Sequence, residues 1–181
     1  MGGVPLVDER GAHGRGIRHR LLGLGHRRLL RRDPRSPSRD RTPWNIAERT
    51  GDERVLPLFR RYTKLRERLV PYLERSAAAT IATDRPLMRP LFFEWPDDPA
   101  VWTAPTQWLL GDDILVAPVL EEGATEWSVY LPETPEGEWA DAWTGDRITG
   151  GGTGTVPTPI DRIPVFVRGD SIDELLALFR E

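Results

Sequence analysis

The chain has 181 residues, a mass of 20.5 kDa and a formal net charge of −3, which suits one domain of ordinary size. It has no cysteine, so disulfides, thiolate metal sites and cysteine nucleophiles are excluded. No apolar run approaches the roughly 20 residues that cross a bilayer, and the 17 glycines and 17 prolines are typical of a soluble, turn-rich chain.

Positive charge is concentrated in residues 1–42, which hold 11 arginines and four acidic residues, a net charge of +7. The three histidines, His13, His19 and His26, lie in the same segment, so residues 43–181 contain none. A Ser-His-Asp triad or a histidine-ligated zinc therefore cannot be built from residues 43–181. The composition of the segment is typical of a disordered tail. The alternative, a nucleic-acid-binding arm, lacks aromatic residues for base stacking.

Ordered structure is expected to begin near Thr42, and helical periodicity follows. Apolar side chains in residues 55–73 fall on one face of a helix, and basic residues occupy most of its other positions. Pro57 fits the first turn, whereas Pro71 predicts a kink or a restart. A run of alanines extends the predicted helix to about Thr80. Such a helix needs a large partner surface, and the chain offers no obvious one.

After the helix the pattern changes to short strands. The apolar run over residues 86–95 contains two prolines and suits an edge strand. Further strands are predicted over residues 114–120, 127–131, 138–143 and 163–167. Residues 150–155 are predicted to be a loop, and Ser171, with Glu174 three residues on, to cap a short terminal helix. This pattern favours a compact antiparallel β domain or sandwich.

Paired carboxylates would be required for glycosidase chemistry. Asp97 is adjacent to Asp98 in one turn, and Asp112 to Asp113 in another. Adjacent turn residues rarely flank one substrate atom from opposite sides, so we assign them to capping and turn formation. The same interpretation covers three more turn acids: Asp141, Asp146 and Asp161.

Two other patterns are open to a functional and a structural interpretation. The glycine-rich residues 150–154 lack the Lys-Ser/Thr and the helix of a phosphate-binding loop. Seven tryptophans offer a sugar-stacking platform, yet Trp127, Trp139 and Trp143 fall at strand-phase positions that more simply fill a core. Composition and spacing alone predict a helix and a β domain with no catalytic residue, cofactor or metal.

Several blocks, taken together, resemble the C-terminal part of glycoside hydrolase family 31, which contains α-glucosidases and α-xylosidases. They occur in the family's order and approximate spacing, over about residues 41–170. The blocks are residues 66–73 (RERLVPYL), 86–99 (PLMRPLFFEWPDDP), 107–119 (QWLLGDDILVAPV), 129–132 (VYLP), 139–145 (WADAWTG) and 163–169 (IPVFVRG).

The resemblance implies a fold and three segments. Members have a (β/α)8 barrel followed by β-sandwich domains. Because the matched blocks belong to the C-terminal part, the resemblance implies a fold class that is mainly β with helix. Residues 1–42 would be a disordered or non-native segment. Residues 43–100 would be a remnant of the barrel with its last long helix and exit strand. Residues 101–181 would be an antiparallel, β-sandwich-like C-terminal domain with a short terminal helix.

The resemblance also implies a function. Members are retaining α-glycosidases in which one aspartate attacks the anomeric carbon and a second carboxylic acid protonates the leaving oxygen. Both lie on barrel strands upstream of the matched blocks, so no catalytic, cofactor-binding or metal-binding residue is assigned here. The chain is accordingly expected to be an inactive fragment of an enzyme for α-linked glucosides or xylosides. The sequence of residues 94–99 slightly favours the α-xylosidase branch of the family.

Further expectations concern location and partners. We expect a cytoplasmic protein with a carbohydrate substrate in the full-length family, no membrane partner, and self-association through the exposed face of the long helix. The alternatives are a non-catalytic carbohydrate-binding or scaffold domain, and nucleic-acid binding through the basic arm.

The first 42 residues suggest a genetic explanation. The family usually has Arg-x-His shortly before Pro-Trp, but residues 36–44 (SPSRDRTPW) contain no histidine. The 24 arginines against one lysine are typical of a GC-rich gene, in which a wrong frame yields arginine, glycine and proline. A frameshift or misplaced start that replaced the end of the barrel is therefore our hypothesis for this segment.

Overall fold

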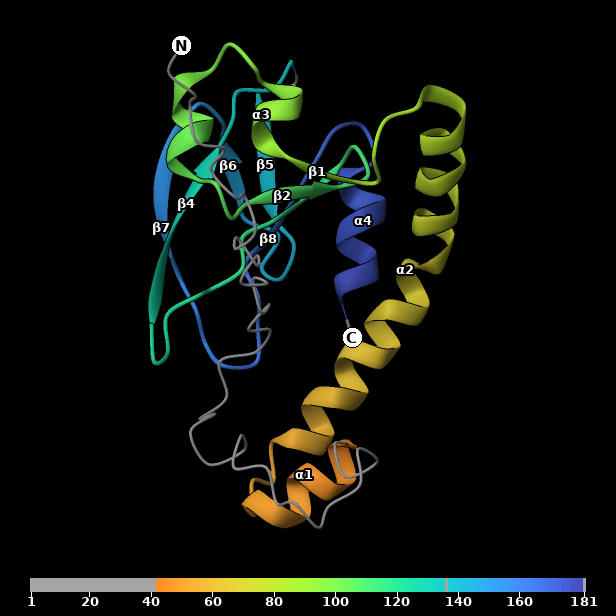
Figure 1. Cartoon of the computed structure of the whole chain (residues 1–181), viewed down its shortest axis with the longest axis vertical. Helices are drawn as coiled ribbons and strands as arrows, with labels where there is room; N and C mark the ends of the chain where they lie inside the picture. The colour runs from red at the N-terminus through yellow and green to blue at the C-terminus, as the bar shows by residue number, and fades with distance from the viewer. Residues whose placement is uncertain (1–41, 136, 181) are drawn as a thin grey trace, which may run out of the picture.

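The computed structural model describes residues 42–135 and 137–180 (Figure 1). The first element is helix α1 (Pro43–Thr50), which the sequence interpretation did not anticipate. Thr42 caps it, because its hydroxyl oxygen accepts a hydrogen bond from the backbone N–H of Asn45 at 3.3 Å. Gly51 ends the helix in the left-handed conformation, at φ +65°.

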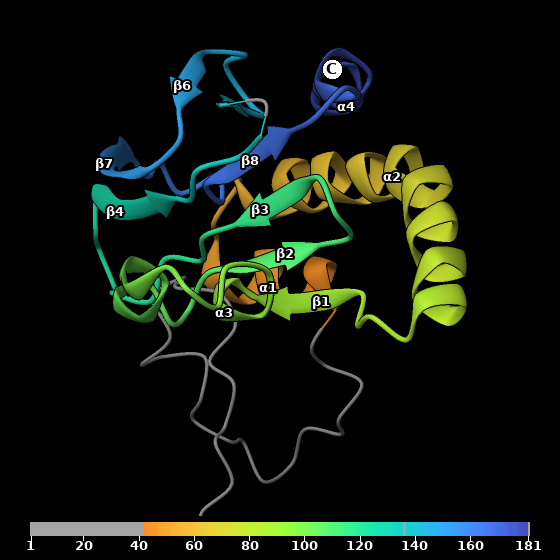
Figure 2. The ribbon, with the colours of Figure 1, turned by 90° about the horizontal axis from the view of Figure 1, so that it is seen from above.

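The predicted long helix is confirmed as α2 (Val55–Thr83), 29 residues in length. Pro57 lies in its first turn, as predicted, where a missing N–H costs no helical hydrogen bond. Pro71 lies in its interior, and the helix continues past it without a restart. The axis of α2 changes direction along its length (Figures 1 and 2), as expected where proline removes a helical hydrogen bond.

The strands within the described ranges form two antiparallel sheets. The larger sheet has the order β1-β2-β3-β8-β5-β6, with β1 (Met88–Pro90), β2 (Trp108–Leu110), β3 (Ile114–Val116), β8 (Val165–Arg168), β5 (Glu138–Asp141) and β6 (Arg147–Thr149). The smaller sheet pairs β4 (Glu126–Leu131) with β7 (Gly152–Pro157). The shorter helical segments are α3 (Leu91–Glu94), the 3-10 helix η2 (Pro99–Thr103) and α4 (Ile172–Phe179).

The larger sheet is covered on both faces, because successive side chains of a strand point to opposite sides. The face toward α2 and α4 buries Ile114, Ala140, Val165 and Val167. The opposite face, toward β4, α3 and η2, buries Leu109, Leu115, Trp139 and Phe166. Figure 2 shows the resulting layers, with α2 and α4 to one side and β4 and β7 to the other. The predicted class, mainly antiparallel β with some helix, is confirmed.

The structure supplies the partner that the sequence interpretation could not find for the long helix. Leu65 and Tyr72 of α2 are buried in the same cluster as the sheet residues and as Leu175 and Phe179 of α4. Other apolar side chains of α2 stay exposed: Phe59, Val70 and Ile81. Self-association through these exposed side chains stays a prediction.

The apolar run at residues 86–95 differs from its prediction. Its edge position is confirmed, since β1 is the first strand of the sheet, but the strand ends at Pro90 and α3 follows. The helical turn places Leu91 and Trp95 against the same core cluster, and the N–H of Trp95 donates to the Leu91 carbonyl at 3.0 Å. The strand expected over residues 114–120 likewise ends early, at Val116.

The loop prediction for residues 150–155 was wrong over most of its length. Gly152–Pro157 is strand β7, which pairs with β4 along its entire length. Glycine has low strand propensity, but the hydrogen bonds of a neighbouring strand override that preference. Gly150 allows close approach, since a Cβ there would lie 2.4 Å from the Pro132 carbonyl oxygen.

Three further details depart from the sequence interpretation. The alternation expected in β4 fails because Val129, Tyr130 and Leu131 are all buried. Ser171 does precede α4, but its side chain makes no capping hydrogen bond. Strand β1, in the segment assigned to a barrel remnant, pairs with β2 in one sheet. The proposed domain boundaries stay a prediction.

Candidate functional site

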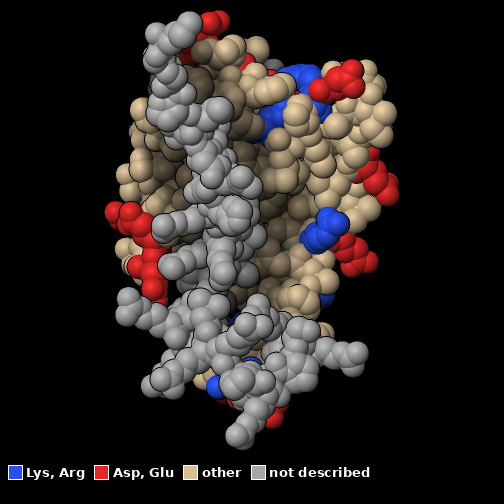
Figure 3. Space-filling model, in the orientation of Figure 1, with Lys and Arg blue, Asp and Glu red and all other residues tan. Residues whose placement is uncertain are grey.

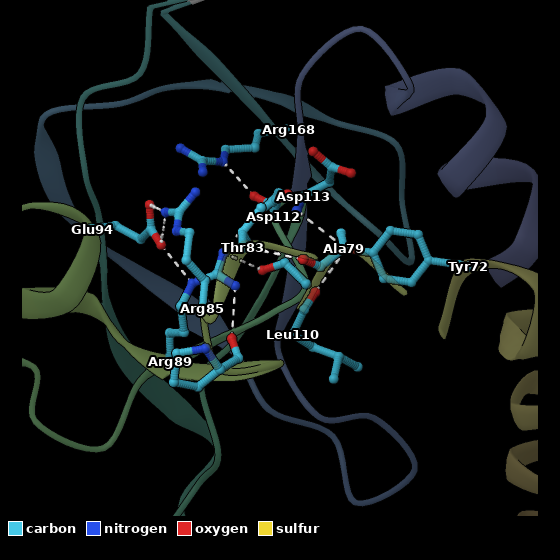
Figure 4. Close-up of polar contacts among 12 residues, drawn as sticks. Tyr72, Ala79, Thr83, Arg85, Arg89, Glu94, Leu110, Asp112, Asp113 and Arg168 are labelled. Carbon is cyan, nitrogen blue, oxygen red and sulfur yellow. Dashed lines mark hydrogen bonds and ion pairs between the residues drawn. The ribbon is translucent and has the colours of Figure 1, made fainter. Parts of the chain in front are cut away.

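A buried arginine organises the junction between α2, β1 and β2 (Figure 4). Arg89 of β1 is 2% exposed, and each polar group of its guanidinium has a partner. Its Nε donates to Glu94 Oε1 (2.5 Å), and its Nη1 to the Pro86 carbonyl (2.8 Å). Its Nη2 donates to the Gly111 carbonyl (2.9 Å) and to Asp112 Oδ1 (2.5 Å). The charge is therefore fully compensated inside the fold.

The tight turn between β2 and β3 is held against α2 by a tyrosine. The Tyr72 hydroxyl donates to the Leu110 carbonyl at 2.7 Å and accepts from the N–H of Asp113 at 3.2 Å. Gly111, between them, has φ +66°, and a Cβ there would lie 2.3 Å from Tyr72 Oη. Glycine is thus required twice, for conformation and for space.

A second tyrosine repeats this arrangement ten residues earlier on α2. The Tyr62 hydroxyl donates to the Asp161 carbonyl (3.3 Å) and accepts from the N–H of Ile163 (3.2 Å). Arg61 adds an ion pair with Asp161 at 2.9 Å. Two hydroxyl groups therefore fix the register of α2 against the β domain, each by one donated and one accepted hydrogen bond.

Arg168, at the end of β8, links the arginine junction to the tryptophan core. Its guanidinium lies over Trp95 (4.8 Å to the ring centroid) and Trp139 (5.5 Å), and its Nε donates to the Asp112 carbonyl at 2.8 Å. Cation–π contacts of this kind stabilise a partly buried guanidinium. They also fix the Trp95 ring in place.

Asp98 and Asp141 have the capping and turn-forming roles that the sequence predicted, whereas Asp112 and Asp161 form ion pairs with distant arginines instead. Asp98 Oδ1 accepts from the N–H of Ala100 at the start of η2, and its Oδ2 accepts from the Tyr130 hydroxyl. Asp112 pairs with Arg89. Asp141 Oδ1 accepts from the N–H groups of two turn residues, Trp143 and Thr144.

Of the remaining candidate acids, Asp146 shares the β5–β6 turn with Asp141, whose backbone N–H donates to the Asp146 carbonyl at 2.9 Å. The Asp146 carboxylate accepts from the Thr144 hydroxyl at 2.7 Å, and Asp161, which precedes β8, pairs with Arg61. Asp113 contributes its backbone N–H to Tyr72. Asp97 is exposed in the α3–η2 connection. The structure thus places the candidate acids in several turns, with Asp141 and Asp146 in the same one.

The tryptophans are used largely in the interior, as predicted for three of them. Trp139 is fully buried, and its indole N–H donates to the Pro132 carbonyl at 2.8 Å. Trp143 packs against the α2–α4 cluster and donates to the Ile163 carbonyl at 2.7 Å. Trp127 is partly buried against the opposite cluster. Trp44 and Trp102, by contrast, are 58% and 61% exposed.

Burial raises the pKa of all three tyrosines, Tyr62, Tyr72 and Tyr130. At Tyr130 the nearby Asp98 carboxylate adds to the effect of burial, and the pKa rises to about 12. The folded state therefore holds these protons above about pH 10, where an unfolded tyrosine releases them. Stability from this source is complete below pH 10 and is lost as pH rises through the folded pKa values.

We expect the native chain to show little tyrosinate absorbance at about pH 10, where free tyrosine is half ionised. The same chain in guanidinium should titrate near pH 10 with its full amplitude. Ultraviolet absorbance titration of both states is the measurement. Half-ionised tyrosine in the native state at that pH would contradict the buried positions of the three hydroxyls.

Although α2 has 29 residues, no helix in the described ranges is apolar enough to span a bilayer. Within residues 42–135 and 137–180, metal-ligating side chains form no group of three that could hold an ion. On the face shown in Figure 3, charged side chains lie in small separate groups. The nucleic-acid hypothesis concerns residues 1–42, which lie outside the described residues except for Thr42.

Comparison with known proteins identifies the fold. Residues 84–172 match the model of the glycosyl hydrolase family 31 C-terminal domain. The chain belongs to glycosyl hydrolase family 31. The α2–β1 junction described above is therefore built from two blocks of a family 31 sequence, residues 66–73, which carry Tyr72, and residues 86–99, which carry Arg89 and Glu94.

Individual family 31 proteins agree with this assignment. The chain is 57% identical over 143 residues to a 1,3-alpha-isomaltosidase of Kribbella flavida, covering 79% of this chain and 19% of that protein. It is 35% identical to an alpha-xylosidase of Saccharolobus solfataricus, covering 74% of this chain and 17% of that protein. The solved structure of the cycloalternan-degrading enzyme from Trueperella pyogenes with isomaltose has a TM-score of 0.69 at 46% identity, covering 74% of this chain and 18% of that chain. The chain thus spans about a fifth of the length of these family 31 relatives.

Sequence reasoning missed the residues that build the junction. Arg89 was treated as part of an apolar run, although a single charge between Met88 and Pro90 is itself a sign of a buried ion pair. Tyr62 and Tyr72 were counted as apolar residues of the helix face. Their hydroxyl groups, which need partners when buried, were the available signal.

Proposed function

We propose that the chain is the C-terminal part of an α-glycosidase of family 31 that acts on α-linked glucosides of the isomaltosyl type. The support is the 57% identity to a 1,3-alpha-isomaltosidase, against 35% to an alpha-xylosidase. This preference replaces the slight lean toward xylosidases taken from residues 94–99. The described part of the chain serves as a supporting domain in that enzyme, and residues 43–100 continue into its barrel.

We also propose that the described residues contribute no acid or nucleophile to catalysis. Retaining glycosidases place two carboxyl groups on opposite sides of the scissile bond, about 5–5.5 Å apart. The observation that carries the proposal is that three of the candidate acids are engaged in the fold. Asp98 faces the η2 amide and Tyr130, Asp112 faces Arg89, and Asp161 faces Arg61.

We expect the purified chain to hydrolyse nitrophenyl α-glucoside, nitrophenyl α-xyloside and isomaltose no faster than buffer alone does. The reason is that both the nucleophilic and the electrostatic contributions to glycosidase catalysis require the paired carboxyl groups. Release of nitrophenol, and of glucose from isomaltose, is the measurement, with the Kribbella flavida isomaltosidase as positive control.

Two variants make this assay decisive. Asp98→Asn and Asp112→Asn each remove one carboxylate from one of the two adjacent acidic pairs while keeping the size of the side chain. Hydrolysis by the native chain that either variant abolishes would overturn the proposal. Hydrolysis that persists unchanged in both would identify another source of activity in the chain and overturn it equally.

A further inference from the structure

A groove lies between the connection from α3 to η2 and the turn from β4 to β5. Its volume is about 690 Å³. One wall is formed by residues 94–98 and the other by residues 133–135, with Tyr130 and Gly151 completing the lining. The two walls are joined by a hydrogen bond, since the indole N–H of Trp95 donates to the Glu133 carbonyl at 2.9 Å. The groove is therefore a defined feature of the fold.

Thr134, which lines this groove, holds a hydroxyl without a partner. The residue is 5% exposed, and its Oγ1 has no hydrogen-bond partner in the described part of the chain. The other buried polar residues differ in this respect. Gln107 exchanges two hydrogen bonds with the backbone of Tyr130, and the Thr158 hydroxyl donates to the Ala124 carbonyl at 2.9 Å. A buried hydroxyl left unpaired is costly, and such sites are often completed by a ligand or a water.

Two carboxylates of the groove are free to accept hydrogen bonds. Asp98 and Glu94 are already engaged, with Tyr130 and with Arg89. Asp97 and Glu133 are exposed and make no side-chain hydrogen bond or ion pair within the described ranges. A carboxylate without a cation partner accepts up to about four hydrogen bonds from hydroxyl groups. Trp95 adds an indole ring that Arg168 and Trp139 hold in place.

We propose that this groove binds a neutral oligosaccharide. Sugar hydroxyls would donate to Asp97 and Glu133, and one would pair with the Thr134 hydroxyl, the buried group of the lining that has no partner among the described residues. The acidic walls disfavour anionic ligands such as phosphate or sulfonate. The inference rests on the proposed function, because the oligosaccharide that we expect in the groove is the α-glucan on which the proposed enzyme acts.

The experiment is a titration of the intact chain with isomaltotriose, followed by backbone amide chemical shifts. We expect saturable shifts at Trp95, Glu133 and Thr134, with a dissociation constant near about 1 mM. Thr134→Val removes the hydroxyl at nearly constant volume. It should weaken binding about tenfold while leaving thermal stability equal or higher, because the unpaired buried group is gone.

The matched control is Thr158→Val, which removes an equally buried hydroxyl that already has a partner. It should lower thermal stability and leave isomaltotriose binding unchanged. Asp97→Asn and Glu133→Gln, both at exposed positions, should each weaken binding without a change in stability. A tetra-arginine peptide serves as the cationic probe and should bind no more tightly than isomaltotriose does.

Three results would overturn the inference. They are no saturable shift with isomaltotriose up to about 10 mM, unchanged affinity in Thr134→Val, and tighter binding of tetra-arginine than of the trisaccharide. The hydrolysis assay is independent of all three. Turnover by the chain would overturn the proposal that the described residues contribute no acid or nucleophile and leave the titration valid, whereas absence of binding would overturn only the groove.

Discussion

Replacing Arg89 by methionine is expected to lower the free energy of unfolding by about 3–5 kcal/mol, the largest single effect in the α2–β1 junction. The substitution keeps an unbranched side chain of similar reach but removes every donor. Glu94 loses a buried partner, and the carbonyl oxygens of Pro86 and Gly111 lose their hydrogen bonds to it. Guanidinium unfolding, followed by circular dichroism, measures the change.

Arg85→Met is the matched control for this substitution. Arg85 also pairs with Glu94, but its side chain is 44% exposed, whereas that of Arg89 is 3% exposed. An exposed ion pair contributes only about 0–1 kcal/mol, so Arg85→Met should lower the free energy of unfolding by at most about 1 kcal/mol. Equal losses in the two variants would show that burial of Arg89 is not what makes its ion pairs important.

The second large effect is expected for Gly111→Ala, which should destabilise the chain by about 2–5 kcal/mol. A non-glycine residue in the left-handed region costs roughly 1–2 kcal/mol, and overpacking adds about 1–3 kcal/mol. The new Cβ would lie 2.3 Å from Tyr72 Oη and 2.7 Å from Ser76 Oγ. The Tyr72 ring would have to move, and its hydroxyl would lose both the hydrogen bond to the Leu110 carbonyl and the one from the Asp113 N–H.

Gly123→Ala separates these two contributions. Gly123 has φ +79°, and no atom lies within 4 Å of the position a Cβ would take. Its substitution should therefore cost only the backbone term of about 1–2 kcal/mol. Adding Tyr72→Leu to Gly111→Ala should reduce the excess cost, since the overlapping ring atoms are removed. Equal unfolding free energies for Gly111→Ala and Gly123→Ala would contradict the close contact with Tyr72.

Gly111→Ala and Tyr72→Leu address how α2 is attached to the β domain. The helix buries Leu65 and Tyr72, yet its position along the sheet is set by directional contacts from Tyr62 and Tyr72. Apolar packing alone is non-directional. The hydroxyl groups therefore contribute register, and the apolar face contributes most of the burial.

The elements that could be predicted from the sequence are those with a local pattern. The side-chain periods of α2 and α4 are visible within a single window of residues, and the family 31 blocks are contiguous as well. The elements that were missed, α1, α3, η2, β2, β6 and β7, have three to eight residues each, too few to show a period. The turn roles of Asp98 and Asp141 were predictable because an aspartate bonds the backbone two or three residues away.

The amino-acid sequence by itself determined the family, the long amphipathic helix and the local hydrogen bonds of Asp98 and Asp141, because each depends on neighbours in the chain. Only the tertiary structure decided that Arg89 is buried, since its partner Asp112 lies 23 residues away. It also decided that Gly152–Pro157 is a strand, through pairing with β4, and that Thr134 is buried without a partner. In each case the free energy comes from atoms that a long stretch of chain brings together, and no local pattern records that contact.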